Sequence, residues 1–211
     1  MSITTETTHP LEFLQSEAPG SLSRESVTLA SGATYTAGQV LAASMTASGA
    51  KVSGTGDGTV GSVTVGALAQ PGIYLLTCIA ESSNAGTFSV VAPDGSALPN
   101  LTVASAYVSS HISLTVADGA ADWDIGDVIH VTVVVANYVA FAVAGTAGAQ
   151  TPAAICAGSY DATDAAQKGA VIARNAEVKS AMLGWPSGIS AANKSIATSR
   201  LAARGIVIRG A

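Results

Sequence analysis

Short β-branched runs closed by turn residues fill the middle of this 211-residue chain and limit the folds open to it. The runs lie at 63–65, 73–79, 87–91, 101–103, 112–116 and 128–133. Gly, Pro, Asn and Asp separate them, as at 71–72 and 93–95. Strands of this length with such regular turns predict an all-β, sandwich-like domain over residues 53–136.

The flanking segments predict a second, mixed unit. Strand-like runs lie at 26–29, 38–41, 153–156 and 206–208. A helix is predicted over 191–204, because Ser190 is a suitable N-cap and Gly205 is a suitable terminator. The chain as a whole is therefore predicted to be mainly β with minor α content, an α+β fold.

The predicted organisation has three parts. Residues 1–22 are polar, contain two prolines and show no apolar period, which is typical of an extended N-terminal arm. Residues 23–52 and 137–211 are predicted to form one small, discontinuous, loop-rich domain. Residues 53–136 are predicted to interrupt it as an inserted domain.

One segment imitates a membrane span. Residues 128–149 carry no formal charge and have the ~20-residue length of a spanning helix. However, the β-branched run 131–135 favours strands, Asn137 interrupts the segment, and no Lys or Arg flanks it. We therefore predict a pair of buried strands here and no membrane partner.

Charge is unevenly distributed along the chain. The formal net charge is −5, and no Lys or Arg occurs between Lys51 and Lys168, where nine carboxylates lie. This balance argues against a nucleic-acid partner and indicates two structural units. Cys78 and Cys156 are far apart and predict buried free thiols. The first residues lack a signal-peptide pattern, so we expect synthesis in the cytoplasm without export.

Motifs that resemble chemical sites are weak. Residues 56–61 satisfy the GxGxxG pattern, but a strand-like run follows where a phosphate site needs a helix. The carboxylates of Asp118, Asp122, Asp124 and Asp127 could bind calcium, yet their spacing does not match an EF-hand and turn formation is the favoured explanation. The histidines are scattered. We predict no enzyme activity, no metal site and no cofactor.

Several segments together resemble the head decoration proteins of tailed phages, the family typified by phage lambda. On the C-terminal side these are 170–178, the Trp185-Pro186 corner, the capped helix and the closing 205–209. Further matching segments are 23–29, 37–42 and 160–163. The resemblance covers roughly 9–52 and 137–209, and the block 53–136 resembles an extra domain that some members carry.

The resemblance implies a structural, cementing virion protein on the outer surface of the capsid. It implies homotrimers that bind the major capsid protein after the head expands and stabilise the shell against the pressure of packaged DNA. It also implies that the N-terminal arm contacts the capsid through Pro10, Leu11, Phe13 and Leu14. Trp185 and Pro186 are candidates for a core anchor or a trimer contact.

The sequence leaves alternatives open. Leu11, Phe13 and Leu14 could fold back onto their own domain instead of meeting a partner. Residues 53–136 could form an adhesion module that binds glycans at the virion surface. An enzyme with an unrecognised site is disfavoured, because no activated nucleophile or base can be named.

Overall fold

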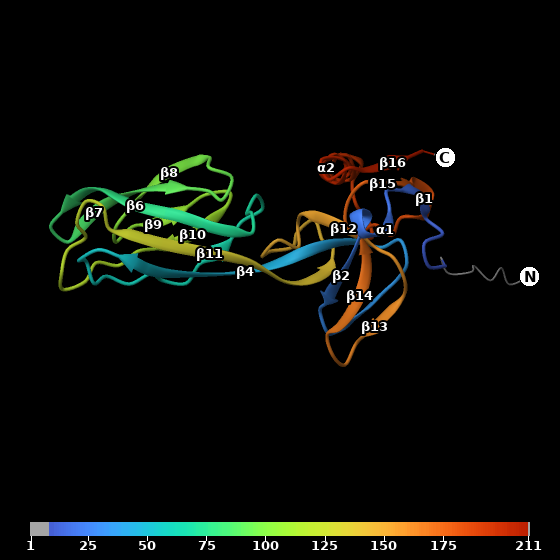
Figure 1. The fold of residues 1–211 in the computed structure, drawn as a ribbon, viewed down its shortest axis with the longest axis horizontal. Coiled ribbons are helices and arrows are strands. Elements are labelled where there is room, and N and C mark those ends of the chain that lie inside the picture. The colour runs from blue at the N-terminus through green and yellow to red at the C-terminus, as the bar shows by residue number, and fades with distance from the viewer. Residues whose placement is uncertain (1–8, 211) are drawn as a thin grey trace, which may run out of the picture. The chain divides into compact units, whose positions relative to one another are not determined.

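A computed structural model describes residues 9–210 of the chain (Figure 1). About 49% of the chain is strand and 9% is helix, which confirms the prediction of a mainly β protein with minor α content. The residues divide into two compact units. Within the described residues, unit 1 comprises 9–44, 136–145 and 149–210, and unit 2 comprises 45–135 and 146–148.

Unit 1 contains a closed barrel of five strands, which the sequence did not predict. Its strands are β2 (Arg24–Leu29), β14 (Gln167–Ile172), β12 (Pro152–Cys156), the first part of β4 (Val40–Ser53) and the end of β11 (Val128–Ala140). The barrel closes where Tyr138 pairs in parallel with Leu29. A barrel of so few strands is narrow, so small residues are needed inside: a Cβ on Gly169 would lie 2.6 Å from Leu29 Cδ1.

A second layer of unit 1 surrounds another apolar cluster. It consists of a three-stranded sheet, β1 (Leu14–Glu17), β15 (Ala176–Lys179) and β16 (Ile206–Arg209), with helix α2 (Ala191–Ala202). Ser190 caps α2 as predicted, because its Oγ accepts the Asn193 amide at 3.2 Å. The helix ends two residues earlier than predicted, and Gly205 follows with φ of 77°.

Four shorter elements complete the described part of unit 1. They are α1 (Gly20–Ser23), β3 (Ala33–Tyr35), β13 (Tyr160–Ala162) and the 3-10 turn η1 (Ser180–Met182). β3 and β13 form a two-stranded ladder, which places Tyr35 in the core of the barrel. The Tyr35 hydroxyl donates to Ala30 O at 2.9 Å, so this buried polar group is satisfied.

Unit 2 encloses its own core between two sheets. The larger contains the outer parts of β4 and β11 with β6 (Gly72–Ser82), β7 (Ala85–Val91) and β8 (Ala97–Thr102). The smaller contains β5 (Thr64–Val65), β9 (Ala106–Val108) and β10 (Ile112–Thr115). Burial alternates along β6 and β7, as expected of strands with one face on a core. Tyr74, Phe88 and Ile112 are fully buried there.

The segment 128–149 differs from its prediction. It forms a single strand, β11, that runs from 128 to 140 and is followed by turns, so the prediction of a strand pair is wrong. Asn137 does not interrupt the strand, because its neighbours 134–136 are exposed and a polar side chain there reaches solvent. Within residues 9–210, no helix is long and apolar enough to cross a membrane.

The glycine-rich segment 56–61 packs against the core of unit 2. Trp123 is 0% exposed, lies edge-on to Phe88 and donates from Nε1 to Ala117 O at 3.1 Å. A Cβ on Gly58 would lie 2.6 Å from that nitrogen, so no larger residue fits. The next strand is β5, and no helix follows to receive a phosphate. The glycines therefore serve close packing.

Asp127 fastens the same segment to the sheet. This carboxylate is 3% exposed and accepts the amides of Thr55 at 3.1 Å, Gly56 at 2.9 Å and Asp124 at 3.2 Å. Burial by itself raises the pKa of Asp127, but these hydrogen bonds and the nearby Lys51 outweigh it and leave the pKa below its ordinary value. The ionised carboxylate is therefore a structural acceptor.

Replacing Asp127 by Asn should destabilise unit 2. The neutral amide keeps one acceptor oxygen and turns an NH₂ toward backbone donors, so we expect a loss of about 2 kcal/mol in the free energy of unfolding at pH 7. Because the folded pKa is lowered, the wild-type contribution is complete above the unfolded pKa of about 4 and disappears as pH falls through the folded value. Urea unfolding between pH 7 and pH 3 measures the loss of stability in the variant and the pH dependence of the wild-type contribution. Asp164→Asn, at an exposed position, is the matched control, and an equal loss in both variants would contradict this role.

Candidate functional site

The N-terminal segment from residue 9 folds onto unit 1. Strand β1 pairs antiparallel with β15, with Leu14 opposite Val178. Phe13 is 0% exposed in the cluster beneath this sheet, and Leu11 and Leu14 pack partly against it. The cluster therefore folds back onto its own unit, the alternative that the sequence left open. The part of the predicted arm at 1–8 lies outside the described residues.

The surface of this segment differs from its buried side. Pro10 is exposed, and Leu11 and Leu14 are half-buried. Leu11 has φ of 62°, which directs the chain through a turn before β1 begins. Phe13 is a core residue in this conformation, so the apolar surface that the segment offers a partner consists of Pro10 with the exposed parts of Leu11 and Leu14.

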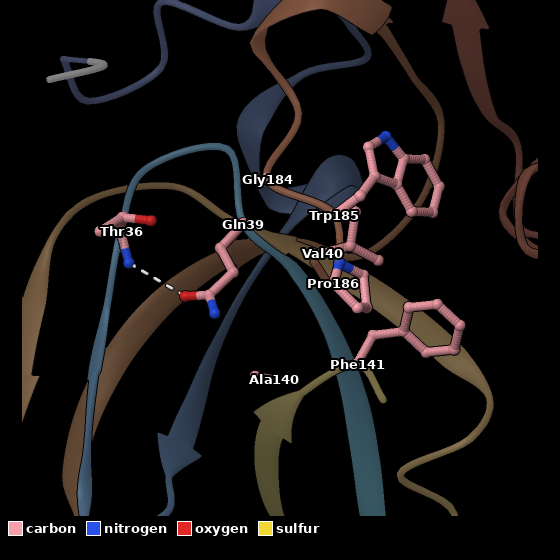
Figure 2. A pocket seen from close by; sticks show the side chains of 8 residues that line it. All are labelled: Thr36, Gln39, Val40, Ala140, Phe141, Gly184, Trp185 and Pro186. Carbon is pink, nitrogen blue, oxygen red and sulfur yellow. Dashed lines mark hydrogen bonds between the residues drawn. The ribbon is translucent and has the colours of Figure 1, made fainter. Parts of the chain in front are cut away.

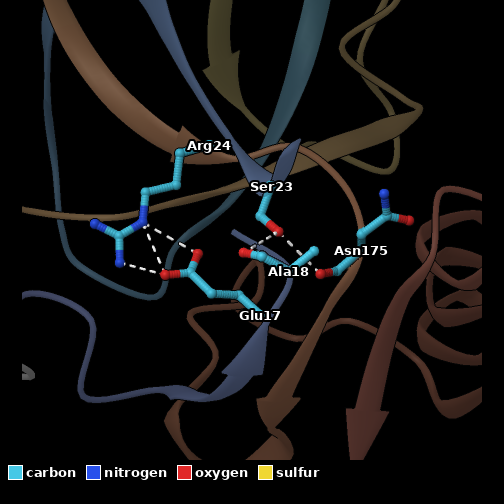
Figure 3. A network of polar contacts seen from close by, with 5 residues as sticks. All are labelled: Glu17, Ala18, Ser23, Arg24 and Asn175. Carbon is cyan, nitrogen blue, oxygen red and sulfur yellow. Dashed lines mark hydrogen bonds and ion pairs between the residues drawn. The ribbon is translucent and has the colours of Figure 1, made fainter. Parts of the chain in front are cut away.

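A polar network fastens the segment after β1 (Figure 3). The Arg24 guanidinium meets the Glu17 carboxylate, with Nε 3.1 Å from both oxygens. The Ser23 hydroxyl is buried and lies 3.0 Å from Asn175 O and 3.2 Å from Ala18 O. The Ala18 amide also donates to Asn175 O at 3.0 Å. Side chains and backbone thus join the N-terminal segment to the turn before β15.

The outer face of the sheet adds a second fastening. Glu177 on β15 accepts the Ser16 hydroxyl from β1 at 2.9 Å and an Arg209 Nε bond from β16 at 3.0 Å. The Arg209 hydrogen bond is the main cause that lowers the pKa of Glu177, and Ser16 contributes. All three strands of the sheet are therefore linked through one ionised carboxylate at neutral pH.

Trp185 and Pro186 border an uncharged pocket of about 240 Å³ (Figure 2). The other lining residues are Thr36, Gln39, Val40, Ala140, Phe141 and Gly184. The Trp185 ring lies edge-on to Phe141 at 6.4 Å between centroids, and Lys194 Nζ lies 5.5 Å from its centroid. Gln39 Oε1 accepts the Thr36 amide at 3.1 Å, which fixes the amide group at the pocket wall. Trp185 thus packs within unit 1 and also borders an open surface.

Chemically reactive groups are not gathered in the described part of the chain. No three His, Cys, Asp or Glu side chains there are placed to hold a metal ion. Two members of the predicted acidic cluster serve loops: Asp122 accepts the Asn84 amide, and Asp124 accepts the Thr55 hydroxyl. Burial raises the pKa of the Cys156 thiol to about 11 and also raises that of Cys78, so neither is an activated nucleophile.

Comparison with protein families identifies the chain. The family model for bacteriophage lambda head decoration protein D matches residues 3–206. The chain belongs to this family. No curated protein and no solved structure matches it significantly. Head decoration proteins are structural, non-enzymatic components of the virion, where they sit on the outer surface of the phage capsid and stabilise it.

Substitutions at Phe13 and Pro10 should distinguish a core residue from a surface residue of the same segment. Phe13→Ala removes a fully buried ring, so we expect a loss of about 3–5 kcal/mol in the free energy of unfolding. Pro10→Ala changes an exposed side chain and should stay within about 0.5 kcal/mol of the wild type. Chemical denaturation of the two variants measures the difference. Similar stabilities for both would show that the segment is not part of the core.

Proposed function

We propose that this head decoration protein binds the outside of the expanded phage head as trimers and clamps major capsid subunits against the pressure of packaged DNA. The observation that carries the proposal is the fastening of the N-terminal segment, which combines the β1–β15 ladder with the Glu17, Ser23 and Glu177 contacts. A segment held in this way can bear load between a capsid subunit and the body of unit 1. Family membership supports the location on the capsid.

The capsid contact is assigned to Pro10, Leu11 and Leu14. These side chains are adjacent, uncharged and at least partly exposed, whereas Glu12 between them keeps its charge because the His9 amide lowers its pKa. A partly apolar surface of this size gives a weak contact by itself. Many identical copies on a symmetric shell multiply such contacts, so weak individual binding is sufficient.

The proposed domain organisation follows from the same interpretation. Residues 23–52 and 137–211 form the decoration domain, and 53–136 are an insertion with its own core. The separate apolar clusters of the two units support this division. Unit 2 holds seven of the fourteen carboxylates and one of the nine Lys and Arg residues, so the insertion is strongly acidic.

Trimerisation is assigned to the surface around Trp185 and Pro186. The pocket there is uncharged and has one aromatic wall, and such surfaces are enriched at protein interfaces. The edge-on packing on Phe141 holds the Trp185 ring in place, so little side-chain entropy is lost on contact.

Co-sedimentation with phage heads tests the capsid contact. Wild-type protein should pellet saturably with expanded heads of its own phage and not with unexpanded heads. Pro10→Glu places a charge in an apolar contact, so we expect affinity for expanded heads to fall by about tenfold or more, with unchanged stability. Ser83→Glu, in an exposed turn of unit 2, is the matched control. Equal binding of the wild type to both head forms, or full binding by Pro10→Glu, would contradict the proposal.

Sedimentation of the protein with and without a change at the pocket tests the trimer. We expect a mass three times that of one chain, either for the free protein in solution or for protein that is cross-linked on heads and then released. Pro186→Glu should shift this species toward the monomer, because a carboxylate would be desolvated in the contact. Thr163→Glu, an exposed position on another loop, should leave the trimer intact. A wild-type protein that stays monomeric on heads would exclude this assembly.

A further inference from the structure

The large sheet of unit 2 has one face on the core and one face turned outward. Tyr74, Leu76 and Cys78 on β6 point into the core, so the alternate positions point out. The same alternation on β4, β11 and β7 extends this outer face over four neighbouring strands. Its exposed large apolar side chains are Val52, Ile73, Leu75, Ile79 and Val134.

Charge is absent from this outer face. A register shift between Cys78 and Ala80 pairs Glu81 with Gly86, whose Cβ position faces the core side near Trp123, so Glu81 lies off the outer face. The outward positions of the four strands therefore carry no Asp, Glu, Lys or Arg within residues 45–135, all of which the structure describes, and His130 is their one titratable group. The carboxylates lie elsewhere: Glu81 shares a pocket with Asp122 and Asp124, and Asp127 is buried. Lys51 turns to the carbonyl of Gly54, 3.2 Å away. An uncharged, partly apolar face on so acidic a unit requires an explanation.

We propose that this outer face is a contact surface between two copies of the chain. With seven carboxylates and one lysine, two copies of unit 2 repel each other through any surface that brings the carboxylates together. Through the uncharged face, two copies can meet without bringing like charges together. Identical faces related by a two-fold axis need no charge complementarity, because each uncharged strand packs on its counterpart.

The size of the face sets the strength of the contact. Four strands about 4.8 Å apart and about seven residues long cover roughly 400 Å². A stable interface buries about 800 Å² on each partner, so this smaller contact should be weak. Such a contact acts mainly between copies held close together. Its role on the head therefore rests on the proposed function, whereas its existence does not.

Sedimentation equilibrium of the full chain from micromolar to millimolar concentration tests the contact. The average mass at low concentration shows whether the chain is already a trimer. An increase of the average mass above that value, as the concentration rises, measures the contact through the outer face. We expect the average mass of the wild type to increase with concentration. The mass of Leu75→Lys should stay constant, and that of Val108→Lys should increase as the wild type does. Leu75 is 39% exposed on this face, and Val108 is 75% exposed on the smaller sheet, so both variants should fold. A wild type without growth, or equal growth in Leu75→Lys, would overturn the proposal.

A cysteine variant and a head-binding assay identify the occupant of the face. Leu75→Cys should form intermolecular disulfides at least about tenfold faster than Val108→Cys, since the contact raises the local concentration of one thiol at another. The native thiols are buried and do not compete. Leu75→Lys should bind expanded heads as the wild type does at low occupancy. Loss of that binding would assign the face to the capsid and refute contact between copies.

Discussion

The pairing of Tyr138 with Leu29 closes the barrel, and the rest of unit 1 is built on that closure. The Ala30 amide donates to Tyr138 O at 2.9 Å, and the Tyr35 hydroxyl bonds Ala30 O, so the joint is held by backbone and side chain together. Closure removes two free strand edges, which would otherwise be open to other chains. The sheet that holds the N-terminal segment and the helix α2 then pack on a rigid support.

Local pattern predicted what is local. The N-cap of α2 at Ser190 and the alternation of β6 follow from neighbouring residues, and both are present. Barrel closure could not be predicted, because its contacts join residues that are far apart in sequence, such as Tyr35 and Tyr138, 103 positions apart. Nothing in either segment specifies the partner. The prediction for residues 128–149 was wrong for a related reason, since exposure around Asn137 depends on the tertiary fold.

The candidate site divides in the same way. The sequence identified Leu11, Phe13 and Leu14 as apolar residues in a polar segment, but not that Phe13 is buried while Pro10 stays exposed. Burial depends on the register of β1 against β15 and is not encoded within the segment. The contacts of Ser23 with Asn175 were missed for the same reason, since they span 152 positions. The glycines of 56–61 carried a misleading pattern, because close packing on Trp123 demands the same residue as a phosphate loop.

A protein that stabilises a shell needs firm internal fastening more than tight binding at each site. Under the proposed function, a load applied at Pro10 passes to β1, where Leu14, Ser16 and Glu17 pair with β15. The Glu17–Arg24 pair is partly exposed and adds little to stability by itself, but it holds the segment in register next to the buried Ser23. Under this proposal the weak outer contacts and the inner ladder would have complementary roles: the contacts would provide reversible placement on many equivalent sites, and the ladder would keep the bound segment attached to unit 1.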